Sequence, residues 1–389
     1  MGRGLRLNKI LTRALLIFLP VSVLVYNYTA SKLVSYSESR LATPMLAFLF
    51  VYASWIVFQN RKCLAVREVK YVVLFFILSL PAFFISSFYS IESYLRYFSL
   101  IAFVPLGFMS GLVWSVLFNS IDINHRDLLI SVFLVPVIIS VLMIANSDIL
   151  MDDEISRDYV FGFIVFLPLL LYYRNNLLPL VFLVVSAVIC MISAKRTGIL
   201  IVASLILFLL FIKAETKKAR ESAFIWALVF CCLLLAAYWI LPNLSPQIEN
   251  SFGRLGSFYD DSNEVRFSLY ERTFSEIQQS GIISLFFGHG CLATVELFGN
   301  PAHNDWLEIT YDYGILPLLC IVLLFSSLVF KAIKSFKKDL TASLILSSTL
   351  VVFFITTVGN CMFTNPVAVF MLLFTLGFAK SNLKIQCQK

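Results

Sequence analysis

The chain has 389 residues, of which 60% are hydrophobic and 14% are charged, and its formal net charge is +7. Soluble domains average about 45–50% apolar and about 25% charged residues, so this composition excludes an ordinary soluble fold. The basic residues lie in short clusters between apolar runs. Such clustering is typical of membrane topology, so no nucleic-acid partner is expected.

The apolar runs predict an all-α, polytopic membrane helical bundle, because each span needs about 20 apolar residues. About twelve transmembrane helices are expected, at 14–31, 43–59, 70–89, 97–119, 128–145, 159–173, 177–193, 198–213, 222–242, 313–331, 341–358 and 366–380. The first is expected to stay uncleaved, since no small-residue cleavage site follows it. We therefore divide the chain into helices one to nine (1–242), a long loop (243–312), and helices ten to twelve with a tail (313–389).

The distribution of Lys and Arg orients this bundle. If the chain crosses the membrane twelve times at these spans, 21 of the 30 basic residues fall on the side that holds both termini, and 9 fall on the other. Basic residues concentrate in cytoplasmic loops, so both termini are predicted to be cytoplasmic. The long loop then lies outside the cytoplasm.

The loop 243–312 is far longer than the other connections, and long ordered loops usually carry function. Asp261 and Glu264 fit a capping box that opens a helix through about Gln279. The later stretch 288–290 (Gly-His-Gly) is expected to be a plain turn. The loop is therefore predicted to be helical and to carry the site.

Polar residues gather where the loop returns to the membrane. With Trp306 at the interface, His303 and Glu308 would lie near the outer headgroups. A histidine there is able to accept a proton, since its ordinary pKa is near neutrality, or to hydrogen-bond a loop backbone. The segment lacks the His-Glu-x-x-His spacing of zinc hydrolases, and no metal is expected. The cysteines show no Cys-x-x-Cys spacing, although a Cys291–Cys361 bridge stays open if both residues face an oxidising space.

A second cluster, Lys195 and Arg196, lies between two apolar runs on the sparsely basic outer side. Arginine presents a planar fork suited to bidentate phosphate binding, and the alternative is contact with lipid headgroups. Further outward cations would come from Arg96, Arg254, Arg266 and Arg272. Together these residues predict a pocket for an anionic lipid phosphate.

Three ordered motifs resemble the bacterial O-antigen ligases and the related O-antigen and exopolysaccharide polymerases. They are Ser193-Ala-Lys-Arg-Thr-Gly198 before an apolar helix, Asn263-Glu-Val-Arg-Phe-x-x-Tyr270 with a following Phe287-Gly-x-Gly290, and Ala302-His-Asn-Asp-Trp-Leu-Glu308 with a following Tyr313-Gly-Ile315. The likeness covers about residues 185–330, and the N-terminal half agrees in hydropathy alone. Lys195 and Pro317 stand where the family often has a small polar residue and a glycine.

The resemblance implies a metal-independent, inverting glycosyltransferase without a cofactor. Its members transfer a glycan from undecaprenyl diphosphate to an acceptor hydroxyl, on a growing glycan or on lipid A-core, at the periplasmic face of the bacterial inner membrane. Carried over by motif, Arg196 and Arg266 hold the diphosphate, and His303 is either the base or a further diphosphate ligand. Substrate-binding roles are expected for Lys195, Tyr270, Arg254, Glu308 and Arg96. Glu308 is also a second candidate base, or a partner that orients His303.

Two questions stay open at this point. The full His-Asn-Asp-Trp-Leu-Glu form favours a polymerase, which joins repeat units, over a ligase, which attaches O-antigen to the lipid A core. Outside the family, the alternatives are a polysaccharide-lipid flippase or transporter and a structural scaffold. Transporters hold their substrates near the bilayer midplane, whereas the polar cluster here lies at the outer edge, which favours transfer.

Overall fold

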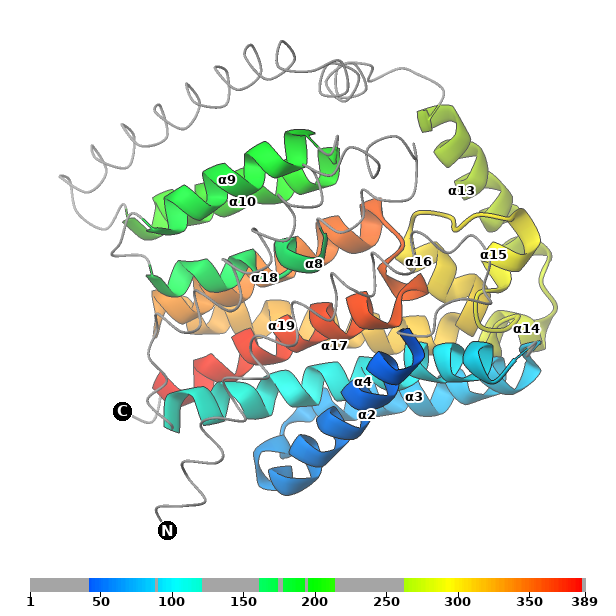
Figure 1. The fold of residues 1–389 in the computed structure, drawn as a ribbon, viewed down its shortest axis with the longest axis horizontal. Coiled ribbons are helices and arrows are strands. Elements are labelled where there is room, and N and C mark those ends of the chain that lie inside the picture. Colours follow the sequence, from blue (N-terminus) through cyan, green and yellow to red (C-terminus); the bar gives the residue numbers. More distant parts are fainter. Residues whose placement is uncertain are drawn as a thin grey trace. The chain divides into compact units, whose positions relative to one another are not determined.

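The computed structural model describes residues 42–87, 90–120, 161–173, 178–192, 195–213 and 262–386. Within these ranges every regular element is a helix, as predicted (Figure 1). The expected spans 14–31, 128–145 and 222–242 lie outside them.

Four of the described helices are long and apolar enough to cross a membrane. They are α3 (Arg67–Ile85), α4 (Ile91–Ser120), α17 (Ile315–Ser335) and α18 (Leu340–Gly359). Shorter apolar stretches lie in α2 (Ala42–Gln59), α9 (Leu178–Ile192), α10 (Arg196–Lys213) and α19 (Pro366–Gln386). These eight helices match eight expected spans and support a multi-pass helical membrane protein. The total of twelve stays a prediction.

The expected span 159–173 is not one continuous helix in its described part. The chain forms a single α-helical turn, α8 (Phe161–Ile164), and then a 3-10 helix, η4 (Leu167–Tyr173). Pro168 explains the interruption, because proline has no backbone N–H and its ring clashes with the carbonyl four residues earlier. That carbonyl belongs to Ile164, where the α-helix ends.

The chain forms two compact units that interleave in sequence. Unit 1 comprises Met1–Ser39, Phe118–Phe258 and Leu340–Val352, and unit 2 comprises Arg40–Leu117, Tyr259–Asp339 and Phe353–Lys389. In the described part of unit 1, α9 and α10 pack against each other, and α8 and η4 pack on α10. The boundaries predicted at 242 and 312 stay predictions.

In unit 2, α4 and α19 approach closely through glycines. A Cβ at Gly107 would lie 2.5 Å from the carbonyl oxygen of Phe370, and one at Gly111 only 2.0 Å from that of Phe374. The two glycines form a Gly-xxx-Gly pair, the spacing that lets membrane helices pack backbone to backbone.

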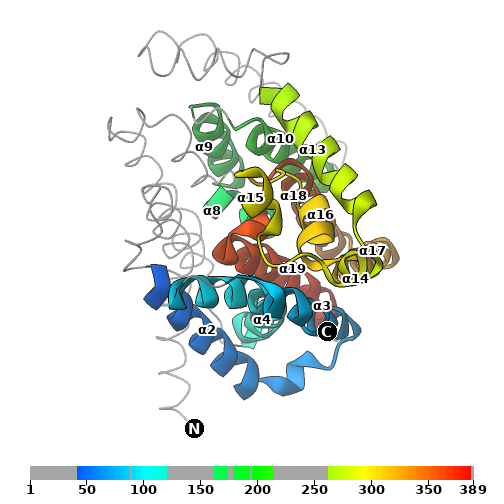
Figure 2. The ribbon, with the colours of Figure 1, turned by 90° about the vertical axis from the view of Figure 1, so that its right-hand side faces the viewer.

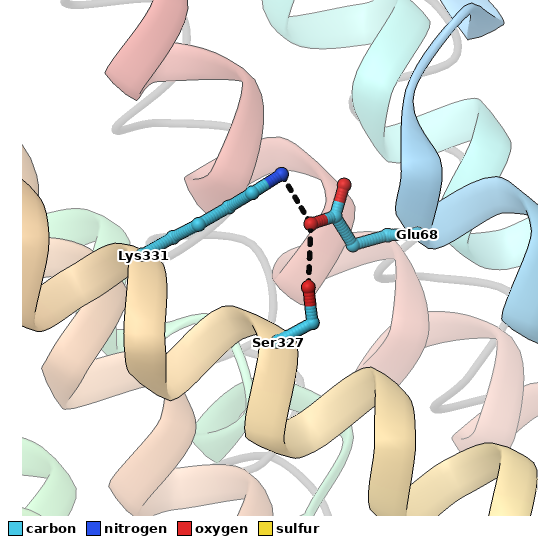
Figure 3. Close-up of polar contacts among 3 residues, drawn as sticks. All are labelled: Glu68, Ser327 and Lys331. Carbon is cyan, nitrogen blue, oxygen red and sulfur yellow. Dashed lines mark hydrogen bonds and ion pairs between the residues drawn. The ribbon is translucent and has the colours of Figure 1, made fainter.

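The other main contact in unit 2 joins α3 to α17. Fully buried Glu68 on α3 makes an ion pair with Lys331 on α17, and Ser327 Oγ donates a 2.9 Å hydrogen bond to the same carboxylate oxygen, Oε1 (Figure 3). A buried carboxylate needs such partners, since charge is costly to remove from water. These side chains fasten the C-terminal half of α17 to the start of α3.

The helices that precede α17 in the chain gather at its opposite, N-terminal end (Figure 2). They are α13 (Ser262–Gln279), α14 (Ile282–Phe287), α15 (Ala293–Phe298), α16 (Asp305–Glu308) and the π-helical turn η6 (Ile309–Tyr313). The 3-10 helices η1 (Arg61–Leu64) and η7 (Met362–Thr364) complete the described elements of unit 2. The end of the predicted loop helix at Gln279 is confirmed, and its predicted cap, Asp261, lies outside the described residues.

Candidate active site

The chain turns sharply just before α16. Asn304 caps this helix, since its side-chain oxygen accepts hydrogen bonds from the backbone N–H groups of Trp306 (3.0 Å) and Leu307 (3.2 Å). The preceding residue, His303, has a φ of +56°, in the left-handed region that residues other than glycine seldom adopt.

Three contacts hold His303 in this turn. Its backbone N–H donates to Oε1 of Glu308 (3.1 Å), and its carbonyl accepts from the hydroxyl of Tyr270 (3.2 Å). Its ring nitrogen Nδ1 lies 3.7 Å from Sγ of Cys361. An unusual backbone conformation persists where its surroundings over-determine it, often at functional sites. His303 is therefore the described side chain that best fits a reactive group.

A buried pair of carboxyl groups underlies the turn. Asp305 and Glu308 lie three residues apart on α16 and are both buried, and Asp305 Oδ1 accepts a 2.8 Å hydrogen bond from the N–H of Phe363. Their other oxygens, Oδ2 and Oε2, are buried without a hydrogen-bond partner. Burial raises the pKa of both groups well above its usual range, and the neighbouring Asp305 raises that of Glu308 further. This setting favours an orienting role for Glu308 over that of a base.

The predicted turn at Gly288, His289 and Gly290 is a docked segment. His289 N–H donates to the carbonyl of Tyr311, and Gly290 N–H donates to that of Asp312, both at 3.0 Å. Gly288 has a φ of +81°, and a Cβ there would lie 2.1 Å from the Asp312 carbonyl oxygen. The His289 ring also stacks on Tyr311, with ring centroids 4.4 Å apart. The glycines therefore let this segment lie directly on η6.

Asp312 ties α15 to η6 through its side chain. Its Oδ1 accepts hydrogen bonds from the N–H (2.8 Å) and hydroxyl (2.6 Å) of Thr294. Burial raises the pKa of Asp312 to about 7, even though these bonds oppose the shift. The turn before α17 thus rests on a carboxyl group that titrates near neutrality.

Helix α13 brings a cation toward His303. Leu269 and Thr273 are buried, Tyr270 is half-buried, and Arg266 is exposed one turn before Tyr270. Burial raises the pKa of Tyr270, and the positive charge of Arg266 acts against that increase. Arg266 therefore lies close to the tyrosine that holds the His303 carbonyl. Arg254 lies outside the described residues.

Arg96, near the start of α4, supports the other side of the site. Its Nη2 donates a 3.4 Å hydrogen bond to the carbonyl of Thr364, in η7. This 3-10 helix directly follows Cys361. Arg96 therefore braces the segment that contacts His303, and substrate binding by Arg96 stays a prediction.

Lys195 and Arg196 belong to unit 1 and lie where α10 begins, shortly after the end of α9. Lys195 N–H donates to the carbonyl of Cys190 (2.9 Å), and both basic side chains are partly exposed. Gly198 lets the start of α10 pack closely on α9, since a Cβ there would lie 2.7 Å from Sγ of Cys190. The two cations thus stand at the start of α10, as predicted.

Among the residues that the structure describes, no three His, Cys, Asp or Glu side chains lie close enough together to hold a metal ion. Cys291 and Cys361 are both free thiols, which removes the possible bridge between them.

Residues 180–322 match a family model described as O-antigen ligase. This part of the chain is similar to that family and is referred to below as the O-antigen ligase-type segment. It contains α9, α10, α13 to α16 and the His303 turn, so the resemblance predicted from the motifs is confirmed. The O-antigen ligase family is one of glycosyl-transferring membrane enzymes, which implies a lipid-linked glycan and an acceptor. No curated protein matches the chain.

Sequence reasoning missed three residues of the site. Asp305 and Asp312 were within or beside the recognised motif, and the apolar neighbours of Asp312 were the available signal that it is buried. Cys361 carried no signal, because it lies 58 residues from His303 and outside the three motifs.

Proposed function

We propose that the protein transfers a glycan from an undecaprenyl-diphosphate carrier to an acceptor hydroxyl at the periplasmic face of the bacterial inner membrane. The observation that carries this proposal is the His303 turn. A single histidine is held in a strained conformation by α13, α16 and the Cys361 segment, within the O-antigen ligase-type segment. The excess of Lys and Arg on the opposite side supports the outer placement.

The reaction exchanges one bond for another at the anomeric carbon. The acceptor oxygen attacks this carbon from the face opposite the diphosphate, so the configuration inverts. The bond from the carbon to the diphosphate oxygen breaks, and the diphosphate leaves with its electron pair. The acceptor proton passes to His303 if this residue is the base. If His303 is a ligand of the diphosphate, the proton leaves to the released diphosphate.

Charge stabilisation is the main demand of this reaction, because negative charge grows on the leaving diphosphate. We assign Arg266 and Arg196 to that charge, since the guanidinium fork matches two phosphate oxygens. Exposed Arg266 stands one turn from Tyr270, and Arg196 opens α10. Lys195 and Arg254 are proposed as further cations for the donor.

Polymerisation is the first candidate and ligation the second. The full motif at 302–308 favours a polymerase, whereas the description of the matching family model favours a ligase. Both reactions need the same donor site and differ in the acceptor.

A clean deletion strain of the source bacterium, with gels of its surface glycan and extraction of lipid-linked intermediates, separates these candidates. Core that carries a single repeat unit identifies a polymerase. Bare core, with long chains on undecaprenyl diphosphate, identifies a ligase. Lipid-linked units that accumulate on the cytoplasmic face would contradict transfer and identify a flippase.

A further inference from the structure

The half-buried thiol of Cys361 lies directly against the candidate reactive ring. Its Sγ is 3.7 Å from Nδ1 of His303, which is within hydrogen-bonding range for the large sulfur atom. Cys361 is not part of a disulfide. Nothing in the recognised motifs assigns a role to this residue.

The same short helix fixes both partners of this contact. Through Glu308, α16 holds the backbone N–H of His303, and through Asp305 it holds the backbone N–H of Phe363, two residues after Cys361. Both carboxyl groups are buried. These two backbone hydrogen bonds hold the segments that carry the thiol and the imidazole. The distance between the two groups therefore does not depend on their side chains alone.

The two ring nitrogens of a histidine are distinct, and the hydrogen bond made by one determines the role of the other. We propose that Cys361 is a positioning residue that holds His303 through Nδ1, so that the reaction with substrate takes place at Nε2. This inference rests on the proposed function for the identity of the substrate. The contact itself is testable without any substrate.

The substrate-free test measures the rate at which N-ethylmaleimide alkylates Cys361 in the purified full-length protein, by peptide mass mapping. An imidazole that contacts a thiol favours the reactive thiolate. We expect Cys361 to react several-fold faster in the wild type than in His303→Gln at neutral pH. Half-exposed Cys63, which lies in η1, is the internal control and should react equally in both proteins. Equal rates for Cys361 in the two proteins would overturn the contact.

The functional test compares Cys361→Ala with Cys361→Ser, and Cys63→Ala serves as the matched control. Loss of the Nδ1 partner should lower kcat between about 10- and 100-fold, because small misplacements of a reacting group are costly. KM for the donor should change little, and the pH profile of kcat should shift. Serine keeps a hydrogen-bonding group and should restore most of the activity. Wild-type kcat and pH profile in Cys361→Ala would refute the positioning role, even if alkylation of the thiol depends on His303.

The two tests separate this inference from the proposed function. Alkylation that depends on His303, in a wild-type protein that transfers no glycan, would retain the contact and refute the function. Active transfer that is insensitive to Cys361→Ala would support the proposed function and refute the positioning role of Cys361.

Discussion

At the scale of single residues, the site depends on groups whose neighbours decide their chemistry. The structure brings together His303, Tyr270 and Arg266, which the motifs had singled out, because motif order and helical spacing are local properties. The sequence did not show that His303 adopts a left-handed conformation. That conformation depends on Glu308 and Tyr270, which reach the same residue from different elements.

Arg266→Lys tests the proposed diphosphate contact. Lysine keeps the charge and loses the planar fork, so we expect kcat/KM for the lipid-diphosphate donor to fall at least about tenfold. Arg272→Lys is a matched control, because Arg272 is also exposed on α13 and should behave as the wild type. The measurement is transfer kinetics on purified variants. Equal activity of the two variants would refute the contact.

The titration of Asp312 predicts a dependence of stability on pH. Burial raises its folded-state pKa to about 7, from about 3.9 in the unfolded chain. The folded state therefore binds the proton more tightly, so this stabilisation is complete below about pH 4 and is lost as pH rises through about 7. We expect the Tm in detergent to fall between pH 5 and 8. In Asp312→Asn the decrease in Tm should be smaller. It should still be present, because burial also raises the pKa of Asp305 and of Glu308. An unchanged slope would contradict this assignment.

At the scale of elements, hydropathy predicted the apolar helices because it is a local property of the sequence. It failed at Pro168, where a single residue interrupts an apolar run. Contacts between helices were not predictable from hydropathy, because lipid-facing and partner-facing residues are equally apolar. The glycines of α4 were the available signal for its contact with α19.

Gly111→Ala tests that contact. The added Cβ would lie 2.0 Å from the carbonyl oxygen of Phe374, so α4 and α19 must separate. We expect a loss of about 1–3 kcal/mol in the free energy of unfolding, as for other overpacked interiors. Gly281→Ala is the control, since a Cβ there meets nothing within 4 Å. Thermal unfolding in detergent measures the stability of both variants. Equal stability of Gly111→Ala and Gly281→Ala would contradict the close approach of α4 and α19.

At the scale of the whole molecule, composition and charge predicted a multi-pass membrane protein, and the family match added glycan transfer. The acceptor was not predictable, because ligases and polymerases share the donor site. The joint action of Arg196 in unit 1 with Arg266 and His303 in unit 2 stays a proposal that rests on the motifs. If both arginines bind one diphosphate, their effects on the free energy of transfer should not be additive. The loss in the double variant Arg196→Lys, Arg266→Lys should then differ from the sum of the losses in the two single variants. Transfer free energies from kcat/KM measure this, and strict additivity would indicate that the two arginines act separately.

The most direct test of the account is transfer by the purified, reconstituted protein. The assay follows the movement of a glycan from synthetic undecaprenyl diphosphate to an acceptor glycan or lipid A-core. The wild type should transfer, and His303→Ala should lose at least about 100-fold in kcat while folding normally, since a reactive histidine contributes at least that factor. His289→Ala, altered at the other described histidine of the loop, should retain most activity. Full activity of His303→Ala, or no transfer by the wild type to either acceptor, would contradict the account.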